Sequence, residues 1–218
     1  MAKVVLEARS LSRSFGSYQA VAPVDLKLQT GTIVALMGSN GAGKSTLMLC
    51  LSGLLFPSSG DVWVEGFPLY GDEIEAKRRL AFVPDTPSFY PELSLWEHLV
   101  FMATAHGAMA EFDQRASTLL DEFGLLSMKD VSPILFSRGM RLKAGILLAL
   151  IRPFRVLLLD EPDAAIDVTS RSVLGHHLER LRSEGAAVLF SSHDPGFSSE
   201  TASQIWWMER GSILTQGP

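Results

Sequence analysis

The sequence predicts an α/β fold that combines a mainly parallel sheet, an antiparallel β subdomain towards the N-terminus and an inserted helical subdomain. Short apolar runs with helical patterns between them are typical of strands that are buried on both faces of a parallel sheet. Four such runs are IVALM from Ile33, LAFV from Leu80, VLLLD from Val156 and AVLF from Ala187. With 218 residues, 47% of them hydrophobic, the chain is long enough to bury the core of one large domain.

The antiparallel part is predicted by segments of strand-like composition that are separated by turn residues. These segments are KVVLEAR, VDLKLQ and GDVWVEG. After IVALM, four leucines recur at helical spacing, and the PSSG that begins at Pro57 ends the pattern. The leucines are Leu47, Leu51, Leu54 and Leu55. We therefore expect a strand, a loop and a helix in this order.

The region from about Asp85 to Ser137 has almost no β-branched run, which favours successive helices. The first main helix starts with a capping box, Ser94-Leu95-Trp96-Glu97. A second helix is expected from Glu111 to Phe123, ending at Gly124. We predict a single domain over 1–218, in which 1–84 and 138–218 form the core and 85–137 form the helical subdomain.

Composition argues against several classes of protein. The formal net charge is −5, from 19 Lys and Arg against 24 Asp and Glu, which disfavours a general nucleic-acid binder. The basic run Lys77 to Arg79 is expected on a solvated helix face. The single cysteine, Cys50, is expected to be a buried small hydrophobe in a reducing cytosol. The N-terminus lacks the apolar region of a signal peptide, and the apolar stretch from Ala144 to Ile151 is far shorter than the roughly 20 residues that cross a bilayer.

Two aromatic pairs are assigned no chemistry. His176 and His177 do not share a helix face, which disfavours a metal site and predicts that both lie on the surface. Trp206 and Trp207 are expected in a terminal hairpin that turns near Gly211, with one ring pointing inward.

The stretch GSNGAGKST, from Gly38 to Thr46, satisfies the phosphate-binding pattern G-x-x-x-x-G-K-[ST]. Its glycines let backbone amides curl around a phosphate, Lys44 reaches the β and γ oxygens, and the Ser45 hydroxyl ligates Mg²⁺. A chance glycine-rich turn is disfavoured, because the motif lies between a predicted buried strand and an amphipathic helix. The sequence therefore predicts a P-loop NTPase core that binds a nucleotide.

Two acids, Asp160 and Glu161, end the apolar run VLLLD. The carboxyl end of a parallel strand is where ligands of open α/β sheets gather. We expect Asp160 to hold Mg²⁺ and Glu161 to polarise an attacking water, which predicts hydrolysis. Ordinary solvated acids are the alternative, which the buried run before them disfavours.

With these motifs in hand, the chain resembles the ATP-binding subunits of ABC transporters over nearly its full length. Gly38 to Thr46 resembles Walker A, VLLLDE resembles Walker B, and AAID, from Ala164 to Asp167, resembles the D-loop. His193 in LFSSHD resembles the switch histidine that contacts the γ-phosphate, and Phe15 the aromatic that stacks on adenine, with Tyr18 as the alternative. The resemblance implies ATP contacts from Phe15, Gly38, Ser39, Asn40, Gly41, Ala42, Gly43, Lys44, Ser45 and Thr46, and catalysis by Glu161, His193 and Lys44.

Two motifs depart from the family pattern. Asp85, in AFVPD, stands where the family usually has Gln, and we still expect its carboxylate to meet Mg²⁺ or water. FSRGM, from Phe136, resembles the signature sequence Leu-Ser-Gly-Gly-Gln, keeping only Ser137 and Gly139. We expect Ser137, Arg138 and Gly139 to contact ATP bound by another subunit. Ser137 is also a candidate helix cap, and Arg138 either adds charge near the γ-phosphate or points into solvent.

The resemblance implies an ATP-hydrolysing, energy-coupling subunit that works as a dimer, most simply a homodimer, with Mg²⁺ and an ATP between two copies. It also implies a membrane permease as partner, a peripheral place on the cytoplasmic face of the membrane, and no nucleic acid. The two departures favour export. The candidate docking groove is apolar and aromatic, and a plain core is its alternative. It comprises Phe89, Tyr90, Leu93, Leu95 and Trp96.

Two other functions are alternatives. A soluble ABC-type ATPase that acts as a clamp in translation or DNA repair is disfavoured, because the chain has no second cassette, long coiled coil or basic face. A regulatory protein that binds nucleotide without hydrolysing it is disfavoured by Glu161 and His193.

Overall fold

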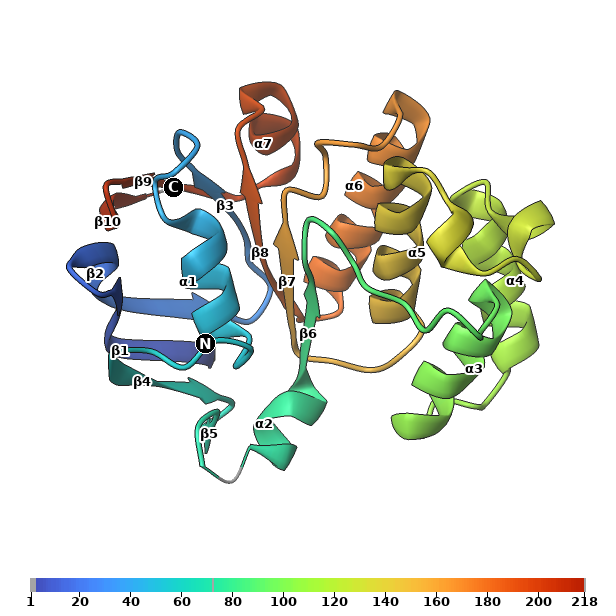
Figure 1. The fold of residues 1–218 in the computed structure, drawn as a ribbon, viewed down its shortest axis with the longest axis horizontal. Coiled ribbons are helices and arrows are strands. Elements are labelled where there is room, and N and C mark those ends of the chain that lie inside the picture. The colour runs from blue at the N-terminus through green and yellow to red at the C-terminus, as the bar shows by residue number, and fades with distance from the viewer. Residues whose placement is uncertain (1–2, 72, 218) are drawn as a thin grey trace. The chain divides into compact units, whose positions relative to one another are not determined.

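The computed structural model describes residues 3–71 and 73–217, which divide into two compact units (Figure 1). The first unit comprises Met1–Phe82, Phe154–Glu161 and Leu178–Pro218, and the second comprises Val83–Pro153 and Pro162–His177. The helical subdomain expected at 85–137 is part of the second unit. That unit also includes 138–153 and 162–177, which were expected in the core.

The N-terminal sheet of the first unit is antiparallel, as predicted. Its strand order is β2-β1-β4-β5, and β1 pairs with both β2 and β4 in antiparallel register. The strands are β1 (Val4–Phe15), β2 (Tyr18–Gln29), β4 (Ser59–Val64) and β5 (Phe67–Pro68).

The second sheet is mainly parallel and has the order β10-β9-β3-β8-β7-β6. Its strands are β3 (Ile33–Met37), β6 (Leu80–Val83), β7 (Val156–Asp160), β8 (Ala187–Ser192), β9 (Gln204–Glu209) and β10 (Ser212–Gly217). β3 pairs in parallel with β8 and β9, and β7 pairs in parallel with β8. Every residue of β3, β7 and β8 is buried, which confirms that three of the four apolar runs are strands covered on both faces; in β6, the fourth, Phe82 is only half-buried.

The hairpin of β9 and β10 is antiparallel and turns at Arg210 and Gly211, as expected. Trp206 points inward and is buried, whereas Trp207 is exposed. The alternation of a strand thus decides which of the two rings packs in the core.

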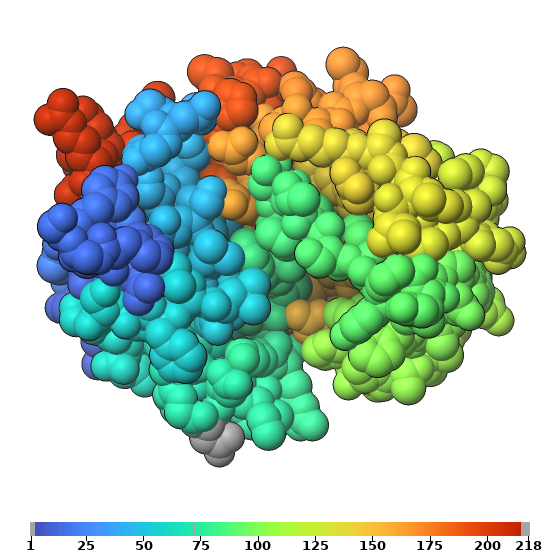
Figure 2. Space-filling model, viewed as in Figure 1, coloured from blue at the N-terminus to red at the C-terminus, as the bar shows by residue number. Residues whose placement is uncertain are grey.

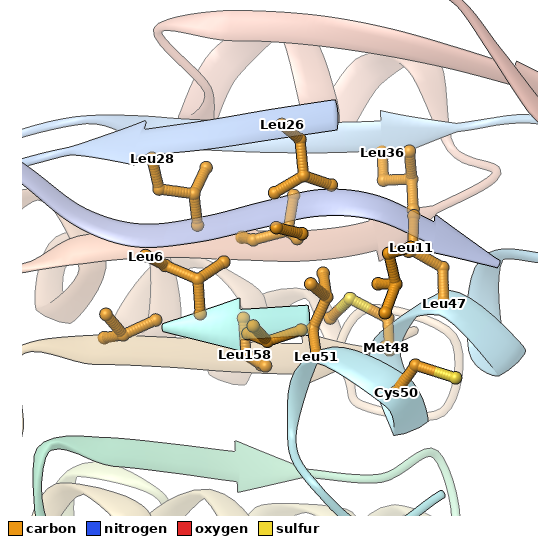
Figure 3. Close-up of a cluster of buried hydrophobic side chains, with 14 of the residues drawn as sticks. Leu6, Leu11, Leu26, Leu28, Leu36, Leu47, Met48, Cys50, Leu51 and Leu158 are labelled. Atoms are coloured by element: carbon orange, nitrogen blue, oxygen red, sulfur yellow. The ribbon is translucent and has the colours of Figure 1, made fainter. Parts of the chain in front are cut away.

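The core of the first unit lies between its two sheets and contains helix α1 (Lys44–Leu51). Leu47, Met48 and Leu51 of this helix meet leucines of both sheets in one apolar cluster (Figure 3). Cys50 belongs to the same cluster, so the expectation of a buried cysteine is confirmed, and burial raises the pKa of its thiol to about 11.

Helix α1 is shorter than its leucine spacing predicts. It ends at Leu51, so the prediction that Leu54 and Leu55 continue it is wrong. Gly53 follows with a φ of 78°, a left-handed conformation that ends helices, and the amide of Leu54 donates back to the carbonyl of Leu49. Leu54 is exposed as a result.

Helices form the second unit. They are α3 (Leu95–Ala105), α4 (Phe112–Glu122), the short 3₁₀ turns η1 (Leu126–Met128) and η2 (Pro133–Leu135), α5 (Arg138–Leu150) and the first part of α6 (Val168–Ser183). The capping box is confirmed: the Glu97 amide donates to Ser94 Oγ at 3.2 Å, and the Ser94 amide donates to Glu97 Oε2 at 2.8 Å. Helix α4 ends before Gly124, which has a φ of 67°.

The start of α3 is hydrogen-bonded to the segment between η1 and η2. The start of α3 and the stretch around η1 and η2 lie side by side in Figure 2. Two backbone bonds join them, from the Leu95 amide to the Val131 carbonyl at 3.0 Å and from the Trp96 amide to the Lys129 carbonyl at 2.8 Å.

The prediction that both histidines of the pair lie on the surface is wrong for His177. His176 is exposed, but His177 is buried, stacks on Phe123 and places Nε2 2.8 Å from Glu122 Oε2. Adjacent residues on a helix face different ways, so His177 can point inward while His176 points outward.

The basic run Lys77 to Arg79 lies on the short helix α2 (Ile74–Arg79) and is neutralised locally. Each of the three side chains pairs with a glutamate, from Glu65, Glu73 or Glu75. Helix α7 (Pro195–Thr201) completes the first unit. Among the residues described, no helix has the length and apolar character needed to span a membrane.

Candidate active site

The loop from Gly38 to Thr46 joins β3 to α1, so a buried strand leads directly into it. Gly41 and Gly43 have φ values of 79° and 105°, which side chains with a Cβ rarely adopt. A Cβ at Gly43 would also run into the Ala20 carbonyl and lie 2.9 Å from the Met208 methyl carbon. The pattern therefore requires glycine here for conformation and for space.

The loop has the features of an anion site. No side chain caps the start of α1, and no acid lies in its first turn, so the first amides of the helix stay available to an anion. Ser39, Asn40, Gly41 and Ser45 are exposed, so the loop is open to solvent. The Lys44 side chain is 4% exposed, and its ammonium donates to the carbonyls of Gly38 at 2.8 Å and Ser39 at 3.3 Å.

The two acids lie where β7 ends. Asp160 is the last residue of the strand and is buried, and it faces Ser191 of β8 across the parallel ladder. The Ser191 hydroxyl donates to Asp160 Oδ1 at 2.6 Å and accepts from the Glu161 amide at 2.9 Å. One buried hydroxyl thus joins both acids.

Glu161 has a φ of 48°, a left-handed conformation that costs a residue with a side chain on the order of 1–3 kcal/mol. Its Oε1 lies 3.9 Å from Lys44 Nζ and 3.7 Å from His193 Nδ1. The structure therefore brings together the three predicted catalytic residues, with the carboxylate of Glu161 between two nitrogens. His193 is 55% exposed, which leaves its ring accessible to a ligand.

The donors for Mg²⁺ are oxygens, which this hard cation prefers. Asp160 offers a carboxylate with one oxygen fixed by Ser191, and Ser45 offers an exposed hydroxyl on α1. Within the described ranges, no group of three or more His, Cys, Asp or Glu could hold a metal ion. Magnesium in nucleotide sites commonly needs only one or two protein ligands besides phosphate oxygens and water, so these two donors fit it.

Both candidate adenine-stacking rings lie at the end of the β1–β2 hairpin. Phe15 and Tyr18 are cross-strand partners, and both are about half exposed or more. The Arg13 guanidinium lies over the Phe15 ring, 4.5 Å from its centroid, which leaves the other face for a planar ligand.

In the second unit, Ser137 caps helix α5, as the sequence suggests. Its hydroxyl accepts from the Met140 amide at 3.3 Å. Gly139, in the first turn, packs against the D-loop-like stretch so closely that a Cβ would run into the Ala165 carbonyl. Lys143, one turn further along, lies 3.4 Å from Asp167 Oδ2. The signature-like turn and the D-loop-like stretch are therefore in contact inside one unit.

Asp167 is fixed by hydrogen bonds at the start of α6. It accepts from the Ser170 amide and from the Ser170 hydroxyl, both at 2.8 Å. These bonds, chiefly the amide, lower the pKa of Asp167 from 3.8 to about 2, and the Lys143 ammonium adds to the effect.

Asp85 and Arg138, the two departures from the family pattern, meet. Arg138 Nη2 lies 2.6 Å from Asp85 Oδ1, and Thr86 Oγ1 lies 3.4 Å from Asp85 Oδ2. The Arg138 guanidinium thus pairs with a carboxylate of its own unit, while its side chain is 56% exposed to solvent.

The candidate docking residues differ in exposure. Leu95 is buried and belongs to the core, Phe89, Leu93 and Trp96 are half-buried, and Tyr90 is exposed. His98, which the sequence did not single out, holds this loop: its buried ring accepts from the Tyr90 amide through Nε2 at 3.0 Å. The sequence signal for it is weak, since a single histidine in an apolar helix has many explanations.

Comparisons with known proteins show which chains this one is similar to. A family model described as ABC transporter matches residues 21–164. The SkfA peptide export ATP-binding protein SkfE of Bacillus subtilis (strain 168) is 30% identical over 211 residues, 96% of this chain and 87% of that protein. The linearmycin resistance ATP-binding protein LnrL of the same organism is 31% identical over 98% of this chain and 69% of its own length. A solved structure of an ATP-binding subunit of an ABC transporter is 31% identical with a TM-score of 0.91, and the match covers 98% of this chain and 89% of that one.

Proposed function

We propose the following mechanism from the premise that this chain belongs to the ATP-binding subunits of ABC transporters, and is therefore an ATPase whose hydrolysis is coupled to transport. One observation carries the assignment of roles within the chain. It is the position of the Glu161 carboxylate between Lys44 and His193, next to the phosphate loop.

ATP binds with its phosphates in the loop from Gly38 to Thr46, where backbone amides and the Lys44 ammonium surround them. On arrival of the phosphates, Lys44 exchanges the carbonyls of Gly38 and Ser39 for phosphate oxygens, which are better partners for an ammonium. Ser45 and Asp160 would hold Mg²⁺, which when bound would neutralise charge on the phosphate oxygens. Phe15 stacks on the adenine ring.

Glu161 accepts a hydrogen bond from the attacking water and so aims it at the γ-phosphorus. The water oxygen bonds to phosphorus and gives a proton to the Glu161 carboxylate, the bond to the bridging oxygen breaks, and ADP and inorganic phosphate result. His193 contacts the γ-phosphate through its exposed ring and reports whether that group is present. Ser191 is a positioning residue, since its hydroxyl fixes the carboxylate of Asp160 and the backbone of Glu161.

Two copies of the chain enclose ATP, and the second copy supplies Ser137, Gly139 and the amides of the first turn of α5. The exposed Ser137 and the absence of an acid from that turn support this role, because both suit an anion. Binding energy at the γ-phosphate then favours the closed dimer, and hydrolysis removes it.

The partner of the dimer is a membrane permease, which places the subunit at the cytoplasmic face of the membrane. The relative named for peptide export supports an exporter, as do the two departures from the family pattern. Phe89 and Tyr90 are the docking candidates, because one is half-buried and the other exposed on a loop fixed by His98.

A Glu161→Gln variant tests the mechanism. It keeps the size of the side chain but weakens the base, so ATPase activity should fall at least a hundredfold, in keeping with the loss of a general base. The variant should still bind ATP and should form an ATP-dependent dimer by sedimentation. Normal turnover would contradict the role of Glu161, and a variant that stays monomeric with ATP would contradict the ATP sandwich.

Membrane docking has a separate test. Phe89→Ala should leave the ATPase activity of the isolated subunit unchanged and reduce its co-purification with a membrane protein. Glu92→Ala, an exposed change in the same loop, is the control. Co-sedimentation with ribosomes in place of membranes would support the soluble clamp instead.

A further inference from the structure

An ion pair joins Asp85 and Arg138, which are 53 residues apart in the sequence. Asp85 follows strand β6, and Arg138 is the first residue of helix α5, directly after Ser137. Their side chains lie 2.6 Å apart, with the guanidinium donating through Nη2 to Oδ1. An acid and a base thus stand together at the two places where the family usually has uncharged residues.

Local electrostatics explain why the pair forms. The first turn of α5 contains Arg138 and Arg141 and no acid, so positive side chains add to the positive end of the helix dipole. A carboxylate from outside the helix relieves this repulsion. Asp85 supplies it from a segment that is distant in sequence.

The pair is easily opened. The Arg138 side chain is 56% exposed and that of Asp85 is 36% exposed. Exposed ion pairs contribute little to stability, because water screens both charges and two side chains must be held still. This ion pair therefore contributes little to the stability of the unit, and either side chain can exchange it for a stronger partner.

We propose that Asp85 is a positioning residue that holds Arg138 back in the isolated subunit, and that the triphosphate bound by a second copy replaces the Asp85 carboxylate as the partner of Arg138. This inference rests on the ATP sandwich proposed above. The Arg138 guanidinium prefers a phosphate because its planar donors match phosphate oxygens, and a triphosphate carries more negative charge than one carboxylate. Asp85 therefore competes with ATP for the same guanidinium and opposes dimer closure until ATP is bound.

The competition predicts a gain of function on removing a charge. Asp85→Asn removes the carboxylate that competes with ATP for Arg138, so less ATP should be needed to close the dimer. From the strength of exposed ion pairs, the half-saturating ATP concentration should fall roughly twofold to fivefold. Arg138→Gln should raise it, and Asp85→Asn should have no further effect in an Arg138→Gln chain, because the group that Asp85 restrains is gone.

The experiment measures dimer formation against the concentration of ATP with Mg²⁺, by analytical ultracentrifugation, in chains that carry Glu161→Gln so that ATP persists. The four chains are Glu161→Gln alone, with Asp85→Asn, with Arg138→Gln, and with both. Glu179→Gln is the matched control, since it breaks an exposed carboxylate–arginine pair with Arg182 on α6. In chains with Glu161 intact, Asp85→Asn should lower KM for ATP.

The outcomes separate the possible roles of Asp85. A fall in half-saturating ATP that vanishes in the Arg138→Gln chain supports the competition. An unchanged value, or the same shift in the Glu179→Gln control, overturns it while leaving the ATP sandwich intact. A rise in the Mg²⁺ concentration needed for dimerisation overturns it in favour of a metal ligand. A Glu161→Gln chain that does not dimerise overturns the sandwich and this inference together.

Discussion

Replacing Ser191 by alanine removes the hydroxyl that joins the two acids of the active site. The side chain is fully buried, so water cannot replace it. Two bonds disappear, one to the carboxylate of Asp160 and one from the amide of Glu161. The second bond holds the backbone of Glu161 in the left-handed region, from which this residue would otherwise relax.

The magnitude follows from these contacts. The bond to Asp160 is short and charge-assisted, which is typical of about 1.5–3 kcal/mol, and a buried amide left without a partner costs about 1–3 kcal/mol. Because the two losses share one atom and are not additive, we expect the free energy of unfolding to fall by about 2–4 kcal/mol. For a chain of this size that lowers the thermal midpoint by roughly 5–15 °C. Because Ser191 acts through Glu161 and Asp160, kcat should fall about 10-fold to 100-fold.

The assay compares kcat and KM for ATP hydrolysis with thermal melting, well below the lowered midpoint. Ser198→Ala is the control, because Ser198 is buried to the same extent in the same unit and donates to the sulfur of Met37 and not to Asp160. It should lose some stability and keep kcat. If Ser191→Ala and Ser198→Ala retain the same kcat, Ser191 does not position the catalytic acids and the reasoning fails.

Three other variants test the second unit. Gly139→Ala places a Cβ against the Ala165 carbonyl, so the free energy of unfolding should fall by about 1–3 kcal/mol. The variant should still bind ATP but should no longer form the ATP-dependent dimer. An unaltered dimer would show that the turn can shift. Asp85→Gln should stay active, since the side chain remains polar and the competition for Arg138 is removed; a collapse of the ATPase rate with ATP binding intact would reveal a role that Gln cannot fill. Asp167→Ala should lower stability by about 1 kcal/mol at neutral pH, as expected for a lost helix cap at an exposed site. Because the folded-state pKa of Asp167 is lowered from 3.8 to about 2, its contribution is present above the ordinary value and is lost as pH falls towards 2, so melting curves of the two chains should converge in that window; a constant gap would exclude this source.

Much of the fold could be predicted because its signals are local. The buried strands are visible in the sequence as apolar runs. The phosphate loop needs glycine at fixed positions, because side chains with a Cβ rarely adopt the conformation found at Gly43. The capping box at Ser94 and the stop at Gly124 are likewise contained within a few residues. Predictions of this kind succeed because the residues that cause the structure are adjacent in sequence.

The rest depends on residues that are distant in sequence. Ser191 lies 31 residues from Asp160, and only the parallel register of β7 and β8 places them opposite each other. The burial of His177 depends on Phe123 and Glu122 of another helix. The pairing of Asp85 with Arg138 spans 53 residues, so each looked like an isolated departure from the family pattern.

The early end of α1 has a different cause. Leucine spacing continues past Leu51, but periodicity reports only where side chains would lie if the helix went on. The left-handed conformation at Gly53 breaks the helix first. A glycine before the last periodic residues was therefore the stronger signal.

Capping a helix and binding a nucleotide are compatible roles for Ser137. The bond from the Met140 amide to the Ser137 hydroxyl is long, at 3.3 Å, and the side chain is exposed. A hydroxyl that accepts from a helix amide still has its own proton to donate, so it can bind a phosphate oxygen without giving up the cap. Gly139 lets the first turn of α5 pack closely against Ala165, which fixes the position of that turn against the D-loop-like stretch. The same contacts that start α5 therefore leave its first turn suited to an anion. The Asp85 carboxylate pairs with Arg138 of that turn until the triphosphate takes its place.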